Sequence, residues 1–293
     1  MTSWPWMKGV SVAIADPMDP VDAHDTRESV KGLIAQHRTR IDEITAALCE
    51  HNLYDKTKHD DLWILRFWLS HKKSKAAIRA AIHALEFRHA HGLDERDLRA
   101  VPPHQMTNDA RVQDYWTRRA PGDSLIFTHP DAKRGVILFL HLASMVSGAS
   151  EVIPPETWNW AFIASSEWTF QWLDYVTRTT GRLTKSIRFI DLQGVTLKSF
   201  HRKDLKHDGD IMGQMEDCYP QLLESIKVCN APTFIHIIWT IARAIMPKRV
   251  VEKFDVIHPQ TNDKERQSLY RHISHDTLPV KFGGSNSVPP REW

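Results

Sequence analysis

The sequence predicts an α/β protein with a mainly parallel sheet, preceded by a smaller all-helical unit. In the second half of the chain, short runs of β-forming residues alternate with longer stretches of helical spacing. The predicted strands are 124–128, 136–142, 187–192, 226–229 and 254–258, and the predicted helices are 156–180, about 202–224 and 233–246. Because strands that alternate with helices usually pair in parallel through helical crossovers, this order predicts a parallel α/β sheet.

The first third of the chain has helical periodicity. Apolar residues recur at helical spacing over 27–50, and a second helix is predicted to start after the Asp60–Asp61 cap. Ser74 is predicted to cap a third helix, which stops at Gly92. The predicted organisation is an irregular arm over 1–26, a helical unit over 27–100, an α/β domain over 120–285 and a tail over 286–293, with the connection inside 101–123.

Composition excludes several classes of function. The 293 residues carry a formal net charge of only +2 at pH 7, which predicts no nucleic-acid binding. Cys49, Cys218 and Cys229 form no CxxC pair, so neither a disulfide framework nor a zinc site is indicated. No stretch reaches the roughly 20 apolar residues needed to span a bilayer. We therefore expect a cytoplasmic protein whose membrane contact is peripheral and transient.

The motifs of common enzymes are absent from the sequence. It contains no GxGxxG after a strand, no GxxxxGK[ST], no GxSxG and no HExxH. The 17 histidines have no metal-ligand spacing and are interpreted as surface residues, which gain charge as pH falls through roughly 6.5. We expect no catalytic residue, no metal and no enzyme activity.

One segment, residues 233–246, is apolar over more of its circumference than packing on a sheet requires. At about 100° per residue, His236, Thr240 and Arg243 fall on one narrow polar stripe. Such a helix is either buried on two sides in a large core, or has one face on an internal cavity and another that meets lipid when it moves. The apolar positions cover an arc of about 220° and are Phe234, Ile235, Ile237, Ile238, Trp239, Ile241, Ala242, Ile245 and Met246.

Five motifs in order carry a family resemblance. They are RFWLSHKKSKAAIRAAI at 66–82, IDLQGV at 190–195, YPQLLESIKVCNAP at 219–232, IMPKRVVEKFDVI at 245–257 and LPVKFGG at 278–284. With these motifs the chain resembles the CRAL-TRIO lipid-binding and lipid-transfer family, which includes fungal phosphatidylinositol/phosphatidylcholine transfer proteins. The resemblance implies a helical bracket beside a sheet that floors an apolar pocket, closed by a mobile gate helix at 233–246. It also implies a monomer that holds one lipid or isoprenoid-like ligand.

The resemblance assigns roles to individual residues. Ile187 and Phe189 are expected on the pocket floor, and Lys248 and Arg249 are expected either to meet anionic headgroups or to be solvated. The family's headgroup positions fall on His71, Lys72, Ser186, Arg188, Gln221 and Lys253, with Val250 where a threonine is usual. Gln221 cannot supply a carboxylate and Val250 cannot donate a hydrogen bond. We therefore expect no strong preference for phosphatidylinositol.

Two alternative functions stay open. A scaffold that binds a protein could fill the pocket with its own aromatic side chains, and one predicted helix carries Trp158, Trp160, Trp168 and Trp172. The other alternative is a carrier of haem or another cofactor. The family's axial positions fall on Ile190 and Leu192, which cannot ligate iron, so the ligand would be another histidine such as His141. Apart from the bound hydrophobic molecule, no cofactor is expected.

Overall fold

The computed structural model describes residues 12–21, 25–99, 109–121, 125–127, 137–246, 248–257, 262–270 and 273–287. Residues 1–11 of the predicted arm and 288–293 of the predicted tail lie outside this set. The described strands form one sheet in the order β1–β2–β3–β4–β5, with bounds β1 Leu125–Phe127, β2 Ile137–His141, β3 Ser186–Asp191, β4 Leu223–Cys229 and β5 Phe254–Ile257. β1 pairs antiparallel with β2, and the other neighbours pair in parallel. The predicted mainly parallel α/β fold is confirmed.

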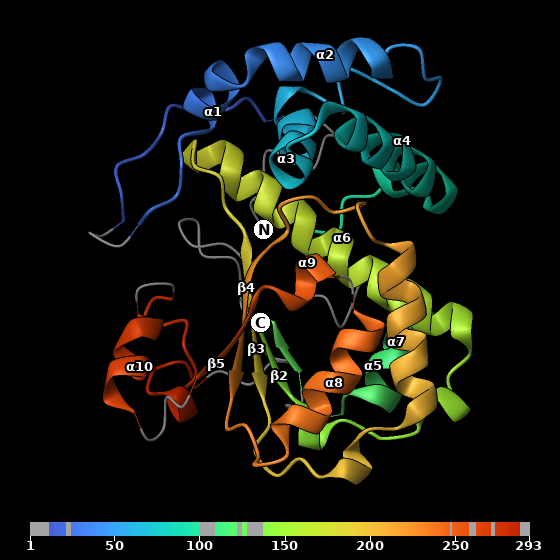
Figure 1. Cartoon of the computed structure of the whole chain (residues 1–293), viewed down its shortest axis with the longest axis vertical. Coiled ribbons are helices and arrows are strands. Elements are labelled where there is room, and N and C mark those ends of the chain that lie inside the picture. Colours follow the sequence, from blue (N-terminus) through green and yellow to red (C-terminus); the bar gives the residue numbers. More distant parts are fainter. Residues whose placement is uncertain are drawn as a thin grey trace, which may run out of the picture.

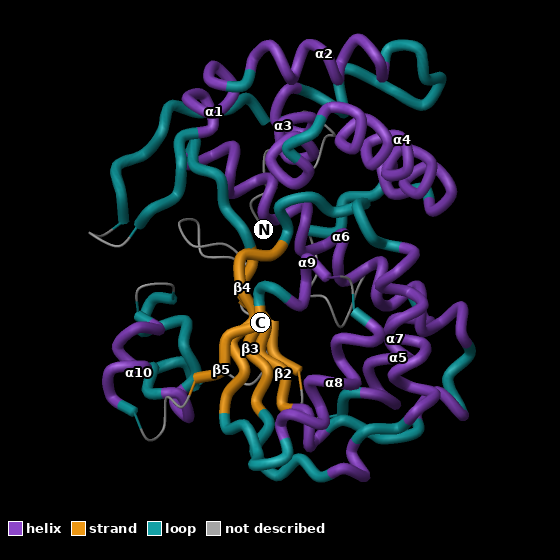
Figure 2. Tube along the Cα trace, viewed as in Figure 1, coloured by secondary structure: helices purple, strands orange, loops and turns teal. Residues whose placement is uncertain are grey.

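Helices cover both faces of the sheet. Figure 1 shows α5, α6, α7 and α8 on one side of the strands and α10 on the other, and Figure 2 shows the same layers around the central strands. A parallel sheet covered on both faces carries apolar residues at odd and even positions. The helices are α5 Ala110–Arg119, α6 Pro155–Thr180, α7 Arg202–Gln214, α8 Ile235–Ile245, α9 Lys248–Val251 and α10 Asp263–Leu269.

The two faces of β3 have different surroundings. Ile187 and Phe189 face the α10 side, where the Phe189 ring stacks on Phe139 at 5.0 Å between ring centroids and lies 6.1 Å from Phe282. Side chains alternate along a strand, so Arg188 and Ile190 point to the opposite side, toward the layer of α6 and α7. The face of β3 that carries Arg188 therefore belongs to a different environment from the packed aromatic face.

Four helices precede the sheet and have a core of their own. They are α1 Val30–Gln36, α2 Arg38–Leu48, α3 Asp61–His71 and α4 Ser74–His91. The single helix predicted over 27–50 is two helices that meet at His37. Asp60 caps α3 as predicted, since its side chain accepts from the Trp63 backbone N–H at 3.2 Å. Gly92 ends α4 with a φ of 58°, a conformation that glycine adopts readily.

The predicted cap at Ser74 is wrong. Ser74 is the first residue of α4, and Lys73 before it makes no side-chain capping bond. The Ser74 hydroxyl instead donates to Glu43 of α2 at 2.8 Å. A serine hydroxyl can bond equally well to a carboxylate from another helix, and the local sequence does not reveal that competing partner.

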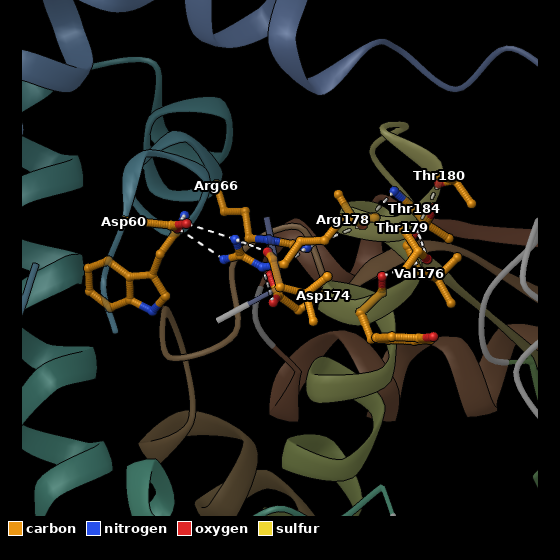
Figure 3. A network of polar contacts seen from close by, with 12 residues as sticks. Asp60, Arg66, Asp174, Val176, Arg178, Thr179, Thr180 and Thr184 are labelled. Carbon is orange, nitrogen blue, oxygen red and sulfur yellow. Dashed lines mark hydrogen bonds and ion pairs between the residues drawn. The ribbon is translucent and has the colours of Figure 1, made fainter. Parts of the chain in front are cut away.

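A network of ion pairs joins α3 to α6 (Figure 3). The Arg178 guanidinium donates to both carboxylate oxygens of Asp60, at 2.7 and 3.0 Å, and its Nε donates to Asp174 at 2.6 Å. The fully buried Arg66 lies 3.5 Å from Asp174 and donates to Thr177 at 3.3 Å. Asp60 thus caps α3 and also binds α6, which holds the four-helix unit against the sheet's covering helix.

Helix α5 was not predicted, because the prolines of 101–123 indicated only a connection. Asp109 caps α5 by accepting from the Arg111 backbone N–H at 2.9 Å, and Val112 and Tyr115 are buried on one face. An Asp followed by apolar residues three to four apart was the available signal. The consequence matters for function, because α5 places Tyr115 and its neighbour Trp116 beside α6.

Helix α7 is shorter than predicted. It ends at Gln214 instead of continuing to about 224, and the chain then makes an irregular turn before β4. Asp217 and Gln221 in this turn have φ values of 72° and 60°, in the left-handed region that stops a helix. The turn brings polar side chains to one end of the sheet, where they border the cavity described below.

The backbone conformation of the LPVKFGG motif at 278–284 requires glycine at its last position. A Cβ atom at Gly284 would lie 1.9 Å from the Leu278 carbonyl oxygen, so only glycine allows this close approach of the two backbone segments. Leu278 and Phe282 are buried against β3 on its aromatic face. The LPVKFGG motif therefore completes the cover of the sheet on the α10 side.

Candidate ligand cavity

A cavity of about 540 Å³ lies on the side of the sheet covered by α5, α6 and α7. Sites that enclose small organic ligands have volumes of roughly 300–1,000 Å³. The described lining comes from α3, α5, α6, α7 and α9 and from strands β2, β3 and β4. Segments from the four-helix unit and from the α/β part of the chain therefore line the same cavity.

The interior wall is mainly apolar. It includes Trp116, Leu138, Leu140, Phe162, Met212 and Met215. Methionine side chains are flexible and adapt to ligands of irregular shape. A wall of this kind binds hydrocarbon by removing it from water, without requiring a particular orientation.

Three hydroxyl residues of α6 line the cavity, Ser165, Ser166 and Thr169, and the first and last of them add little polarity to its wall. Ser165 and Thr169 line the cavity, but both hydroxyls donate to carbonyls of their own helix. The Ser165 hydroxyl bonds the Ala161 carbonyl at 2.7 Å, and the Thr169 hydroxyl bonds the Ser165 carbonyl at 2.8 Å. Because these donors are already satisfied, an apolar ligand can lie against α6 without leaving them unpaired.

One end of the cavity carries an ion-pair cluster, here called the mouth cluster, formed by His71, Glu216, Asp217 and Arg249. Arg249 donates to the Asp217 carboxylate and to Glu216 at 3.3 Å, and His71 Nε2 lies 3.4 Å from Asp217. Arg249 and Glu216 side chains are 42% and 47% exposed, so this end of the cavity faces solvent. Burial lowers the pKa of His71 and the Arg249 cation adds to the effect, whereas Asp217 opposes it. The mouth cluster links the end of α3, the turn before β4 and α9.

Four of the six predicted headgroup residues line this cavity: His71, Arg188, Gln221 and Lys253. Gln221 is held in place, because its side-chain amide donates to the Ser70 hydroxyl at 3.0 Å. Lys253 Nζ donates to the Leu223 carbonyl. Burial and the nearby cations Lys185, Arg249 and Arg188 lower the pKa of Lys253 to about 8, with Glu224 opposing them.

The other two headgroup candidates are not among the described lining residues. Lys72 ends α3 in the left-handed conformation, with a φ of 53°. Ser186 is buried, and its hydroxyl donates to the Leu222 carbonyl at 2.7 Å.

Two pocket-floor predictions are corrected by the structure. Ile187 and Phe189 pack in the aromatic core on the α10 side of the sheet, away from the described cavity lining. The sequence could not distinguish the two faces, because both faces of β3 carry apolar residues. The floor is instead formed by Leu138 and Leu140 of β2 with Arg188 of β3.

Lys248, Arg249 and Val250, which follow the predicted gate, have different surroundings. Lys248 is exposed, with its side chain 90% accessible and 3.8 Å from Glu252. Arg249 lines the cavity and joins the mouth cluster, with its side chain 42% exposed. Val250, where the family usually has a threonine, also lines the cavity and offers no hydrogen bond.

Helix α8 occupies most of the predicted gate segment. Ile235 packs on the sheet cluster around Ile190, and the Trp239 ring meets Phe254 edge-on at 4.8 Å between ring centroids. Ile237 is 39% exposed. Of the gate residues whose side chains are described, which are Phe234, Ile235, Ile237, Trp239 and Met246, none is among the cavity lining. The side chains of Ile238, Ile241, Ala242 and Ile245 lie outside the described set.

The scaffold alternative depends on the tryptophans of α6, and the haem-carrier alternative depends on His141. None of these residues is among the described lining of the cavity. Trp158, Trp160 and Trp168 are buried in the core around α6 and leave the cavity open. His141 lies at the end of β2, with Nε2 3.1 Å from the Gln193 carbonyl and Nδ1 2.7 Å from the Ser144 hydroxyl. Both ring nitrogens of His141 are therefore hydrogen-bonded in this structure.

Comparison with known proteins identifies the class of this chain. The family model described as the CRAL/TRIO domain matches residues 126–284. The chain belongs to this family, which binds and transfers lipids as a general function. The fold is also similar to the structure titled "Crystal structure of Sfh5", with a TM-score of 0.53 at 14% sequence identity, covering 82% of each chain. Within the described residues, no helix has both the length and the apolar character needed to cross a bilayer.

Proposed function

We propose that the protein holds one lipid or lipid-like molecule in its cavity and transfers or presents that molecule at a membrane surface. The observation that carries this proposal is the cavity of about 540 Å³, with its apolar wall, between α5, α6, α7 and the sheet. The tryptophans that could have filled such a space lie in the core beside it. This arrangement favours a carrier over a scaffold.

The energetics of hydrocarbon burial support the carrier. Burying a methylene group stabilises the complex by about 0.8 kcal/mol, so a tail of ten methylenes gains roughly 8 kcal/mol relative to water. Release into water is then slow. Exchange is faster when the cavity opens against a bilayer, because the tail passes from one apolar environment to another.

Helix α8 is the element we propose to move. Its partly exposed Ile237 and its polar stripe allow it to stay in water while closed and to meet lipid when it shifts. The mouth cluster joins α9, which directly follows α8, to the turn before β4. Breaking that cluster is therefore coupled to movement of α8.

The headgroup contacts expected for phosphatidylinositol are weak in this chain. Gln221 is already bonded to Ser70 and Val250 is apolar, so neither residue supplies the oriented polar group that selects one headgroup. We propose that the protein has no strong preference for phosphatidylinositol, and that its ligand can be a different lipid.

Native mass spectrometry of the purified protein, followed by organic extraction, tests this function. We expect one hydrophobic passenger per chain and transfer of that passenger between donor and acceptor vesicles. A chain that carries no passenger, takes up no lipid from vesicles and binds a protein instead would favour the scaffold. Binding without transfer would favour presentation of the ligand to another protein.

A further inference from the structure

Three exposed apolar side chains follow the ends of strands β2 and β3. Val146 is 41% and Val152 61% exposed in the segment after β2, and Leu197 is 54% exposed in the segment after β3. Because β2 and β3 are parallel, their carboxyl ends lie at the same edge of the sheet. The Ser147 hydroxyl donates to the Lys198 carbonyl at 3.2 Å and so joins the two segments. Scattered apolar residues are ordinary on a surface, but these lie on two segments that are bonded to each other.

The segment after β2 is held in place by a buried carboxylate. Asp204 of α7 is 2% exposed, and it accepts from the backbone N–H groups of Gly148 at 2.9 Å and Ser150 at 3.0 Å. Arg119 of α5 donates to Asp204 at 3.0 Å and also to the Val146 carbonyl. The exposed side chains of this segment are therefore displayed on a fixed frame, so little conformational entropy is lost when they meet a partner.

Exposed cations surround Leu197. Lys198 follows it directly, and Arg202 and Lys203 lie in the first turn of α7. Among the described residues, no carboxylate lies within ion-pair distance of Lys198 or Arg202. Lys203 Nζ lies 3.5 Å from the exposed carboxylate of Glu151. Three exposed cations against one exposed carboxylate leave this part of the surface with net positive charge.

These two segments border helix α8. Ile235 at the start of α8 packs in one apolar cluster with Ala143 of the segment after β2 and Phe200 of the segment after β3. Ile237 in the same turn is 39% exposed. Figure 1 shows α7 and α8 side by side on one face of the sheet. The cations and exposed apolar residues are therefore continuous with the helix that we propose to meet the membrane.

We propose that these apolar residues and cations form a docking surface for an anionic phospholipid bilayer. This surface, here called the loop face, consists of Val146, Val152, Leu197, Lys198, Arg202 and Lys203. The inference rests on the proposed function, and it names the surface and the lipid charge through which the protein reaches a membrane. Anionic headgroups attract cations, and the apolar layer beneath them accepts exposed apolar side chains. An acidic protein would match the cations of the loop face but not its protruding apolar residues.

Binding of the full-length protein to vesicles tests the docking surface. One set of vesicles is phosphatidylcholine alone, and the other contains about one third phosphatidylserine. In low salt we expect at least tenfold tighter binding to the anionic vesicles in a sedimentation assay. The difference should disappear in about 1 M salt, where the screening length falls to about 3 Å.

Two matched variants assign the preference to the loop face. Lys198→Gln/Arg202→Gln/Lys203→Gln should lose the preference for anionic vesicles and keep its thermal midpoint, because all three side chains are exposed. The control removes three exposed cations of the four-helix unit, which lies at the opposite end of the sheet (Figure 1), and it should keep the preference. The control substitutions are Lys56→Gln, Lys73→Gln and Lys75→Gln.

A fluorescent label tests whether the apolar part of the loop face enters the bilayer. Leu197→Cys is labelled with an environment-sensitive dye in a Cys49→Ser background, which removes the exposed native thiol. We expect the emission to shift to the blue when anionic vesicles are added, because the dye leaves water. The same dye at Lys75→Cys should show no shift.

Equal binding to the two kinds of vesicle would overturn the inference, and so would an equal loss of preference in the two triple variants. Native mass spectrometry of the same preparations separates this result from a failure of the proposed function. A protein that keeps its passenger but does not prefer anionic vesicles would refute the docking surface alone. A protein that has no passenger and takes up no lipid would refute the carrier, and a preference for anionic vesicles would still support the loop face.

Discussion

Arg88 of α4 and Glu167 of α6 form a buried ion pair in which two guanidinium nitrogens each lie 3.0 Å from a carboxylate oxygen. Glu167 is fully buried, and it also accepts from the Gln171 amide at 2.9 Å. Arg88 binds Asp94 with its remaining nitrogen at 2.5 Å. The pair joins the four-helix unit to the helix that forms one wall of the cavity, next to the lining residue Ser166.

Breaking this pair from one side should strongly destabilise the fold. Arg88→Met would leave the Glu167 carboxylate buried with only an amide as donor, and we expect the free energy of unfolding to fall by about 3–5 kcal/mol. Urea denaturation measures this change. The double variant Arg88→Met/Glu167→Leu should lose less than Arg88→Met alone, because the fully buried carboxylate is then removed and only the partly exposed Asp94 has lost its guanidinium partner. Arg118→Ala, which removes the exposed pair with Asp114, should cost under about 1 kcal/mol.

The titration of Lys253 predicts a pH dependence. Its pKa is lowered from 10.5 to about 8, so the folded protein binds this proton less tightly than the unfolded chain. The stability from Lys253 is therefore present above pH 10.5 and is lost as pH falls through about 8. Lys253→Met should accordingly be more stable than the unsubstituted protein at pH 7, and the difference should shrink above pH 9. Denaturation curves at pH 7 and 9.5 measure both values.

The same titration should affect an anionic ligand. Lys253 is charged below pH 8, so affinity for a long-chain alkyl sulfonate, whose own charge stays constant, should fall as pH rises from 7 to 9.5. Lys253→Met should flatten this profile. A decline of equal size in that variant would assign the pH dependence to another group.

The ion pairs of the mouth cluster are expected to slow the release of the ligand. Asp217→Asn removes the carboxylate that binds Arg249 and lies near His71, while asparagine tolerates the left-handed backbone at this position. A partly buried charged hydrogen bond of this kind is worth about 1 kcal/mol, so we expect release to accelerate by roughly three- to tenfold. Dilution of protein loaded with a fluorescent lipid into acceptor vesicles gives this rate. Lys248→Gln should release at the original rate.

Ile237 of helix α8 is the residue that we expect to contact the membrane. Ile237→Glu changes an exposed side chain, so the fold should be unaffected, but inserting the charge into the bilayer interface costs free energy. Vesicle-to-vesicle transfer should slow by about tenfold, which corresponds to about 1.4 kcal/mol. His236→Glu, on the polar stripe of the same turn, is the control for charge alone. Equal transfer by Ile237→Glu and the unsubstituted protein would contradict the proposed role of α8.

Some features of the site could be predicted from the sequence because they depend on neighbouring residues. The YP and NAP motifs at 219–232 bring Gln221 to the cavity, and the spacing after the gate brings Lys253 there. Other features could not be predicted. Tyr115 and Trp116 reach the cavity only because α5 packs on α6, and Met212 and Met215 reach it from the end of α7. Such residues come from distant segments whose positions are decided by packing.

The order of the five strands and of helices α3, α4, α6, α7 and α8, the family and the general function were determined by the sequence alone, because periodicity and motifs are properties of consecutive residues. Only the tertiary structure decided which face of β3 meets the ligand. Apolar residues occur on both of its faces, since helices cover the sheet on both sides. The direction of Arg249 was decided in the same way, by Asp217 and Glu216 on another segment. A charged side chain takes its orientation from the opposite charge nearest in space, and that neighbour is distant in the sequence.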